Sequence, residues 1–203
     1  MASFARDVFI NCPFDSAYQT MFRAMVFAIT RSGFRARCAL EVDDASQNRW
    51  ASISDIVDQC RYGVHDISRT ESDGDPPLPR FNMPLELGLF LGAKRFGDEL
   101  QKRKRCLVMD TERYRYQRFI SDLAGQDIHA HGDDPAACIE AVASWLRDQS
   151  RSKTVPGGRA MARDFEQFEA QLPALCQGLQ LEVDEMTFGD LTTLMSEYIA
   201  AAL

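Results

Sequence analysis

Several features that mark particular classes of protein are missing from this chain of 203 residues. No apolar run approaches the roughly 18 residues that a membrane-spanning helix needs. The first residues, MASFARDVFINC, lack the basic-then-apolar pattern of a signal peptide. We therefore expect a cytoplasmic protein without a membrane partner. Internal repeats and low-complexity tracts are also missing, so the composition indicates an ordinary globular chain.

The cysteine pattern excludes the common metal and disulfide frameworks. The 6 cysteines lie at wide, irregular separations and form no C-x-x-C pair. His129 and His131 alternate along one weak strand and would share a face, but the sequence places no third ligand beside them. We predict neither a bound metal nor a cofactor.

The charge balance disfavours a nucleic-acid partner. The formal net charge is -7 and the isoelectric point is near 5.0. One small basic cluster, QKRKR, occupies residues 101–105. We interpret it as a solvated junction between a helix and a strand; the alternative is a patch that binds phosphate.

Short β-rich runs alternate with segments of helical spacing over residues 1–150, which favours a parallel sheet covered by helices on both faces. The predicted strands are Asp7–Cys12, Phe34–Leu40, Tyr62–Ser68, Arg105–Asp110 and the weak Gln126–His131. The helical segments between them begin near Ser16, Arg49, Pro84, Tyr114 and Asp134. For five such strands we predict an α/β fold of flavodoxin-like order 2-1-3-4-5.

The pattern changes after residue 150. Residues 151–158 form a polar linker with Pro and Gly, and residues 159–203 predict a helical hairpin. Thr187 and Asp190 have the spacing of a capping box at the start of its second helix. We expect the hairpin to pack on the sheet domain; the alternative is a surface that binds a second copy of the chain or another partner.

The predicted topology also predicts where ligands bind. In open parallel sheets they bind beyond the carboxyl ends of the strands, where the strand order reverses. The turn NCPFD follows the first strand there, and it supplies Asn11, Pro13, Phe14 and Asp15. Its backbone N–H groups and the following helix N-terminus favour an anion. Because the chain has neither G-x-G-x-x-G nor a Walker motif, ordinary dinucleotide redox binding and phosphoryl transfer are disfavoured.

The third strand ends in HDISR, which brings Asp66, Ser68 and Arg69 to the same edge. The loop that follows, RTESDGDPPLPRF, is long, charged and rich in proline. Loops of this kind are lids or disordered insertions, and both interpretations stay open. Arg80, near its end, can pair with a carboxylate or contact a ligand phosphate.

The segment FNMPLELGLFLGA contains one ionisable side chain, Glu86, among apolar neighbours. An unpaired buried carboxylate is costly, so it needs a structural or chemical reason. If Pro84 takes the first helical position, Glu86 lies near the third, where an acidic group stabilises the helix N-terminus. The alternative is a catalytic carboxylate with a pKa tuned by its surroundings, with Asn82 one turn before it.

Three motifs, INCPFD, HDIS and FNMPLELGLFLGA, resemble those of nucleoside 2-deoxyribosyltransferases. The chain is also similar in predicted architecture to Toll/interleukin-1 receptor (TIR) domains, over about residues 7 to 150. The transferases have a Gly-Pro after the first strand where this chain has Cys12-Pro13, and RFNMP replaces their Asp-Gly approach to the glutamate.

This resemblance implies cleavage or transfer of an N-glycosidic bond in NAD or a related nucleotide or nucleoside, with NAD as substrate rather than cofactor. It implies that Glu86 stabilises or traps the ribosyl cation and that Asp66 holds a ribose hydroxyl or orients the nucleophile. The substrate-binding set that we expect is Asn11, Pro13, Phe14, Asp15, Ser68, Arg69, Arg80 and Asn82. The alternatives are a nucleotide sensor without turnover and a TIR-like assembly module, which forms homo-oligomers.

Overall fold

The computed structural model describes residues 4–44, 46–70, 72–73 and 78–202. Its main sheet is parallel and 5-stranded, in the order β2-β1-β3-β6-β7. The strands are β1 (Asp7–Asn11), β2 (Arg35–Cys38), β3 (Tyr62–Asp66), β6 (Arg105–Asp110) and β7 (His129–Ala130). This arrangement confirms the predicted α/β fold and strand order. The strand order reverses at β1, which pairs with β2 on one side and β3 on the other.

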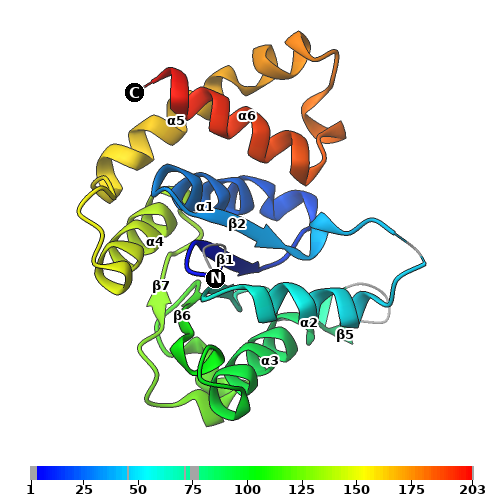
Figure 1. Cartoon of the computed structure of the whole chain (residues 1–203), viewed down its shortest axis with the longest axis vertical. Helices are drawn as coiled ribbons and strands as arrows, with labels where there is room; N and C mark the ends of the chain where they lie inside the picture. The colour runs from blue at the N-terminus through cyan, green and yellow to red at the C-terminus, as the bar shows by residue number, and fades with distance from the viewer. Residues whose placement is uncertain (1–3, 45, 71, 74–77, 203) are drawn as a thin grey trace.

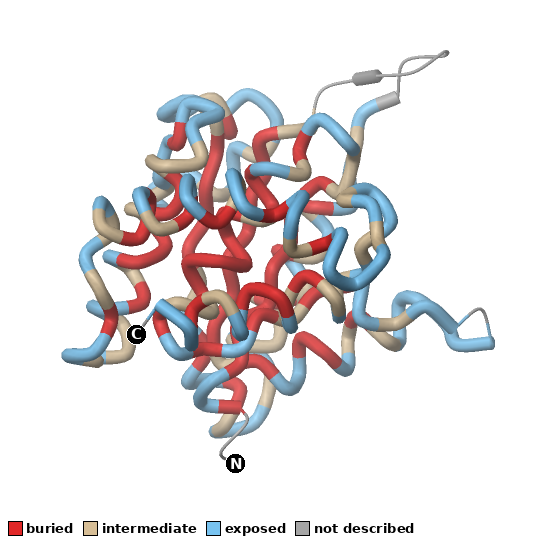
Figure 2. The backbone as a smooth tube through the Cα atoms, turned by 90° about the horizontal axis from the view of Figure 1, so that it is seen from above, coloured by how far each residue is buried: buried red, intermediate tan, exposed pale blue. Residues whose placement is uncertain are grey.

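Helices cover both faces of the sheet (Figure 1). They are α1 (Gln19–Arg31), α2 (Arg49–Gln59), α3 (Asn82–Phe96) and α4 (Pro135–Ser150). Val8 and Ile10 pack with α1 and α4, whereas Phe9, between them in β1, packs with α2 and α3. Residues of β1 and β3 are all buried, as expected for central strands covered on both faces. Figure 2 shows the buried residues gathered in the interior, with exposed segments around them.

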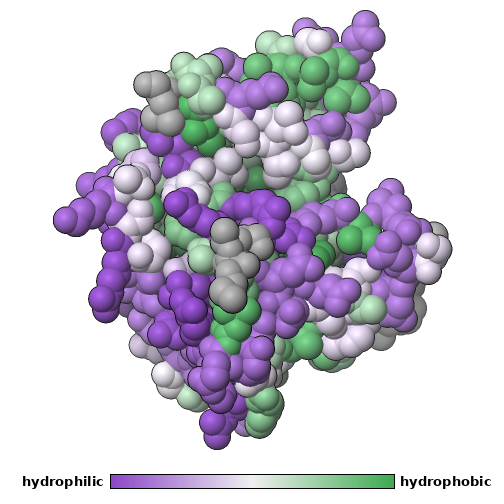
Figure 3. Space-filling view, viewed as in Figure 1, coloured by the Kyte–Doolittle hydropathy of each residue, from purple (hydrophilic) through white to green (hydrophobic). Residues whose placement is uncertain are grey.

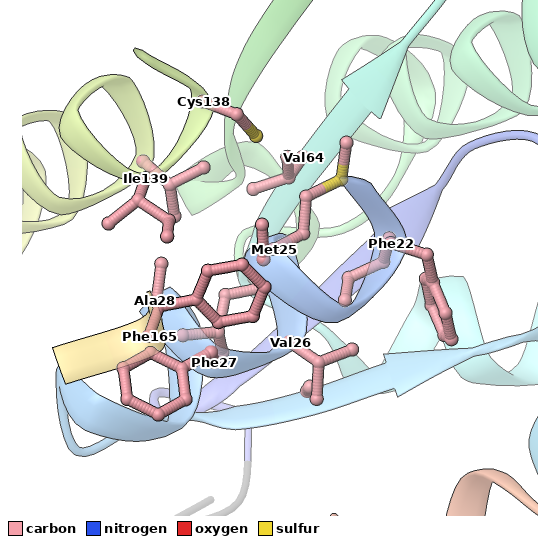
Figure 4. Close-up of a cluster of buried hydrophobic side chains, with 14 of the residues drawn as sticks. Phe22, Met25, Val26, Phe27, Ala28, Val64, Cys138, Ile139 and Phe165 are labelled. Carbon is pink, nitrogen blue, oxygen red and sulfur yellow. The ribbon is translucent and has the colours of Figure 1, made fainter. Parts of the chain in front are cut away.

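The main core lies between the sheet and the helices α1 and α4. Figure 4 shows Ala28 of α1 facing Ile139 of α4, with Val64 of the central strand β3 in the same buried cluster. All three residues are fully buried. The apolar run of α1 is therefore a core segment that fixes the helix directly after the turn at the end of β1.

The helix ends follow the expected chemistry in most places. Gly33 ends the segment after α1 with a φ of +80°, which glycine adopts without a Cβ clash. Asp134 caps α4 by accepting a hydrogen bond from Ala136 N at 2.9 Å. Thr187 and Asp190 form the predicted capping box. Asp15, in contrast, precedes the short 3-10 helix η1 (Ser16–Tyr18) without capping it, because its carboxylate pairs with Arg80.

The helix predicted near residues 114–125 is wrong. The segment contains only two 3-10 turns, η4 (Arg115–Arg118) and η5 (Ser121–Leu123). Tyr114 and Gly125 bound them with φ values of +65° and +93°. The guanidinium of Arg115 binds Asp110 and the carbonyl oxygens of Ile67 and Ser68, so tertiary contacts override the helical spacing.

The loop between β3 and α3 contains a short antiparallel pair, β4 (Ser72–Asp73) and β5 (Leu78–Pro79). Residues 71 and 74–77 lie outside the described part of the chain. The interpretations of this loop as a lid or as a disordered insertion concern these residues.

The C-terminal hairpin packs on the sheet domain as expected. It consists of α5 (Gly158–Gly178) and α6 (Phe188–Ala201), with the 3-10 turn η6 (Val183–Glu185) between them. Phe168 of α5 lies 5.7 Å from the Phe27 ring of α1 and 5.2 Å from the Tyr198 ring of α6, measured between centroids. Arg23 of α1 binds both oxygens of Glu169, at 2.7 and 2.6 Å. The hairpin and the sheet thus share one apolar core. Within the described residues, no helix combines the length and apolar character needed to cross a membrane.

This shared core gives a prediction for Phe168→Ala. Because Phe168 is fully buried, we expect the free energy of unfolding to fall by about 3 to 5 kcal/mol. Unfolding should stay a single transition when circular dichroism and tryptophan fluorescence are followed in denaturant. Leu179→Ala, at a site 51% exposed, is the control and should change little. An early, separate transition for the hairpin would contradict a shared core.

Candidate active site

The candidate site lies at the edge of the sheet where the carboxyl ends of β1, β2 and β3 meet. Asn11 and Asp66 end β1 and β3, and both are buried. The helix α3, which carries Glu86, begins at the same edge because Asn11 Nδ2 donates a hydrogen bond to Met83 O at 2.8 Å. This contact fixes the first turn of α3 against the end of β1.

Glu86 does not have the role of a helix cap. The helix α3 begins at Asn82, so Pro84 is not its first residue and Glu86 lies in the second turn; the first turn has no acidic residue. The Glu86 side chain is half-buried and forms no hydrogen bond or ion pair with the described residues. Of the two interpretations, the one in which Glu86 stabilises the helix N-terminus is therefore wrong, and the helix end does not compensate the cost of burying this carboxylate.

The electrostatics of Glu86 differ from those of an ordinary surface glutamate. Burial raises the pKa of its carboxyl from 4.5 to about 7, and the positive charge of Arg49 opposes this rise. In turn, the negative charge of Glu86 is one of the causes that raise the pKa of the buried Cys12 and Cys38 thiols, after burial itself. Glu86 thus acts on groups at the ends of both β1 and β2. A carboxyl with a pKa near 7 can work as a base or as an acid at neutral pH.

Asp66 has a different environment, although it ends the neighbouring strand. Its Oδ1 accepts a hydrogen bond from Ser68 N at 2.7 Å, and its Oδ2 accepts one from the Tyr18 hydroxyl and lies 2.9 Å from His131 Nε2. Burial raises the pKa of Asp66, but the hydrogen bonds and the charge of His131 outweigh it and hold the pKa below its usual value. Both carboxylate oxygens thus already have protein partners. In this structure Asp66 organises the end of β3.

His131 and Tyr18 are the partners that the sequence did not assign to this site. Burial lowers the pKa of His131, but the hydrogen bond and charge of Asp66 outweigh it, so the net pKa is raised. Burial also raises the pKa of Tyr18, which keeps its hydroxyl a donor to Asp66. The described residues contain no group of three ligands that could hold a metal. His131 therefore forms a buried ion pair with Asp66.

Asn11 also contacts a neutral histidine. Its amide lies 3.1 Å from His65 Nδ1. Burial, followed by the charge of Lys104, lowers the pKa of His65 to about 3. An unprotonated Nδ1 can accept the amide hydrogen of Asn11. Since Asn11 has these two partners and is only 2% exposed, its contacts fasten α3 to the sheet.

The other residues expected to bind substrate fall into two groups. Arg80 Nη1 lies 2.6 Å from Asp15 Oδ2, so these two predicted ligands of substrate contact each other across the turn after β1. Asn82 is exposed at the start of α3, while Pro13 is buried. Ser68 Oγ and Arg69 Nε are buried without a hydrogen-bond partner among the described residues.

Phe14 packs against both apolar clusters of the core, the one with α1 and α4 and the one with α2 and α3. Its ring centroid is 5.3 Å from that of Phe22 in α1, in an edge-to-face arrangement. It lines a cavity of about 690 Å³ between the start of α1 and the hairpin, together with Met186 and Phe188. Figure 3 shows apolar residues gathered over the hairpin on an otherwise largely polar face. Phe14 thus joins the sheet domain to the hairpin.

Arg49 is the functional candidate that the sequence did not indicate. It follows Asn48, which caps α2 by accepting a hydrogen bond from Ala51 N at 3.1 Å. It also lines a cavity of about 210 Å³ after β2, with Asp43 and Asp44. The residues EVDD that follow β2 include Asp43 and Asp44, but the electrostatic effect of Arg49 on Glu86 depends on the fold.

Comparisons of this chain with protein-family models, with curated proteins and with solved structures found no match.

The raised pKa of Glu86 predicts that Glu86→Gln stabilises the protein at alkaline pH. The folded state keeps the Glu86 proton between about pH 4.5 and 7, while the unfolded state releases it, so stability falls as pH rises through this window. The Glu86→Gln variant has no carboxyl at this place, so its stability does not fall in this pH window for this reason. Above pH 7 it should be more stable than wild type by up to about 3 kcal/mol.

Below pH 4 the two proteins should converge, since the carboxyl is then protonated in both states. Denaturant unfolding across this pH range measures the difference. The exposed Glu166→Gln in α5 is the matched control and should show no such dependence. A Glu86→Gln variant that is less stable than wild type at pH 8 would contradict an unpaired carboxylate.

The Asp66–His131 pair predicts that His131→Gln destabilises the protein, and most strongly at low pH. The folded pKa of His131 is raised, so its contribution is complete below the ordinary histidine value near 6.5 and is lost as pH rises through the folded value. At pH 6 the variant should lose about 3 kcal/mol, and the gap should narrow at higher pH. Exposed His129→Gln is the control. A loss that is equal at every pH would argue against a charged pair.

Proposed function

We propose that the protein cleaves or transfers the N-glycosidic bond of NAD or a related nucleotide or nucleoside, and that Glu86 is the catalytic carboxylate. The observation that carries the proposal is a half-buried carboxyl with a pKa of about 7 at the ligand-binding edge of a parallel sheet, with no hydrogen bond or ion pair to any described residue. A glutamate without chemistry would be expected to have a partner or to lie in water.

Breaking an N-glycosidic bond develops positive charge on the ribose ring. The ionised Glu86 carboxylate can stabilise this charge, or it can attack the anomeric carbon while the bonding electrons leave with the base. Water or an acceptor nucleophile then displaces the carboxylate and loses a proton. Nicotinamide is a neutral leaving group in NAD, so its departure needs no acid, which suits a site with one free carboxylate.

The contacts around Glu86 support binding of a ribosyl group with attached phosphate. Arg49 supplies positive charge near the carboxylate and lines the cavity after β2. The unpartnered Ser68 Oγ and Arg69 Nε supply donors at the end of β3. In this proposal Asp66 is a positioning residue, because His131, Tyr18 and Ser68 occupy its oxygens.

One observation favours a sensor without turnover as the second candidate. Transfer and hydrolysis often use two carboxyl groups, whereas the second carboxyl at this edge, Asp66, is engaged within the protein. A binding module would retain the ligand and release no base. Both candidates use the same edge of the sheet, and a single assay separates them.

The assay incubates the purified protein with NAD and a panel of nucleosides and follows nicotinamide or free base by chromatography. Glu86→Gln should lower turnover at least about a hundredfold, with folding checked by circular dichroism, while Glu166→Gln should keep full activity. Because the ionised carboxylate is the active form, kcat/KM should rise with pH to a plateau, with a midpoint of about 7.

Arg49→Gln adds a second readout. Arg49 lowers the pKa of Glu86, so its removal should move the midpoint of the pH profile to higher pH. Retained ligand without released base would favour the sensor. Turnover that survives Glu86→Gln would overturn the assignment of the catalytic residue.

A further inference from the structure

Three arginines surround a cavity at the opposite edge of the sheet, where β3 and β6 begin. The cavity has a volume of about 480 Å³ and is lined by Arg61, Arg105 and Arg151, with Asp148, Gln149 and Ser150 of α4. Arg61 directly precedes β3, and its carbonyl oxygen accepts the N–H of Arg105 at 3.0 Å. The two arginines are therefore held side by side by the sheet.

These arginines have few partners within the protein. None of the three forms an ion pair with another described residue, and Arg61 Nε is buried without a hydrogen-bond partner among them. Arg61 lies over the Tyr62 ring, with 5.2 Å from its Cζ to the ring centroid, and Arg105 Nη1 donates only to Lys104 O, at 3.1 Å. Asp148 brings one negative charge, so the lining keeps an excess of positive charge in a chain whose net charge is -7.

Only part of the basic cluster at residues 101–105 faces the cavity, because some of its charged side chains bind groups within the protein. Lys104 is fully buried and its ammonium donates to the carbonyl oxygens of Val57, in the last turn of α2, and Cys60, its C-cap. Lys102 pairs with Glu99. Arg105 alone among these residues lines the cavity, while Arg103 is exposed outside it.

The third arginine of the cavity, Arg151, directly follows α4. Arg151 has a φ of +55°, a left-handed conformation that favours glycine. It is the C-cap of α4, a place where a left-handed residue commonly ends a helix. Arg151 thus lines the cavity from the end of α4, whereas Arg61 and Arg105 line it from the starts of β3 and β6.

We propose that this cavity binds the phosphate group of a small phosphorylated molecule, at a site separate from Glu86. Arginine guanidinium groups bind phosphate through paired, charge-assisted hydrogen bonds. Several such groups without carboxylate partners repel one another, and an anion removes this repulsion. The volume accommodates a ligand as large as a diphosphate, within the usual range for small-molecule sites.

Isothermal titration calorimetry with pyrophosphate and with inorganic phosphate tests this proposal on the full chain. Tighter binding of pyrophosphate would indicate a diphosphate ligand, and equal binding a single phosphate group. Arg151→Gly suits the left-handed backbone, so it should fold normally and lower the affinity by roughly tenfold or more. Arg61→Met keeps the apolar stem over Tyr62 and should have the same effect.

Arg103→Gln removes one positive charge outside the cavity and should leave the affinity nearly unchanged. Glu86→Gln should also leave it unchanged, which separates this site from the candidate active site. The proposal is overturned if neither anion binds, if the cavity variants bind as wild type does, or if the protein binds single-stranded DNA but neither small anion.

Discussion

The backbone arrangement at the carboxyl ends of the strands depends on the buried ion pair between Asp66 and His131. Two charges buried together are tolerated only when they are paired and hydrogen-bonded. Tyr18 and the Ser68 N–H complete the shell around Asp66. These contacts join the turn after β1, the end of β3 and the start of α4, so the backbone around the candidate site is held from three directions.

Glu86 differs from these buried polar groups because it has no hydrogen bond or ion pair with the described residues. Asn11 fixes the first turn of α3 through Met83 O, and the helix then carries Glu86 to a half-buried place where none of the described residues pairs with it. The pKa values of two acidic side chains near one edge of the sheet are thus shifted in opposite directions. Partners lower the pKa of Asp66, whereas burial raises that of Glu86. Such a difference between neighbouring carboxyl groups is typical of sites that use them for different tasks.

Much of the architecture could be predicted because local chemistry determines it. Apolar runs such as DVFIN produce buried parallel strands, and caps such as Asp134 and Thr187 have local spacing signals. The half-burial of Glu86 also follows from its apolar neighbours. The start of α3 could not be predicted, because Pro84 suggested a later start while the contact of Asn11 with Met83 joins residues far apart in the sequence.

The partners of Asp66 were out of reach for the same reason. Tyr18 lies 48 residues away along the chain, and His131 belongs to a segment after β7. The helix predicted near residue 114 was wrong because Arg115 contacts the ends of β3 and β6. Local spacing thus identifies elements, but long-range polar contacts decide which side chains are satisfied and which remain free for a ligand.

The most direct test is the titration of Glu86 itself. The protein is labelled with ¹³C at the glutamate side-chain carboxyl carbons, and the Glu86 signal is assigned as the one missing from Glu86→Gln. Its chemical shift is then followed by NMR from acidic to alkaline pH. A midpoint of about 7 is the predicted result; a midpoint near 4.3, the value of an ordinary exposed glutamate, would contradict the account.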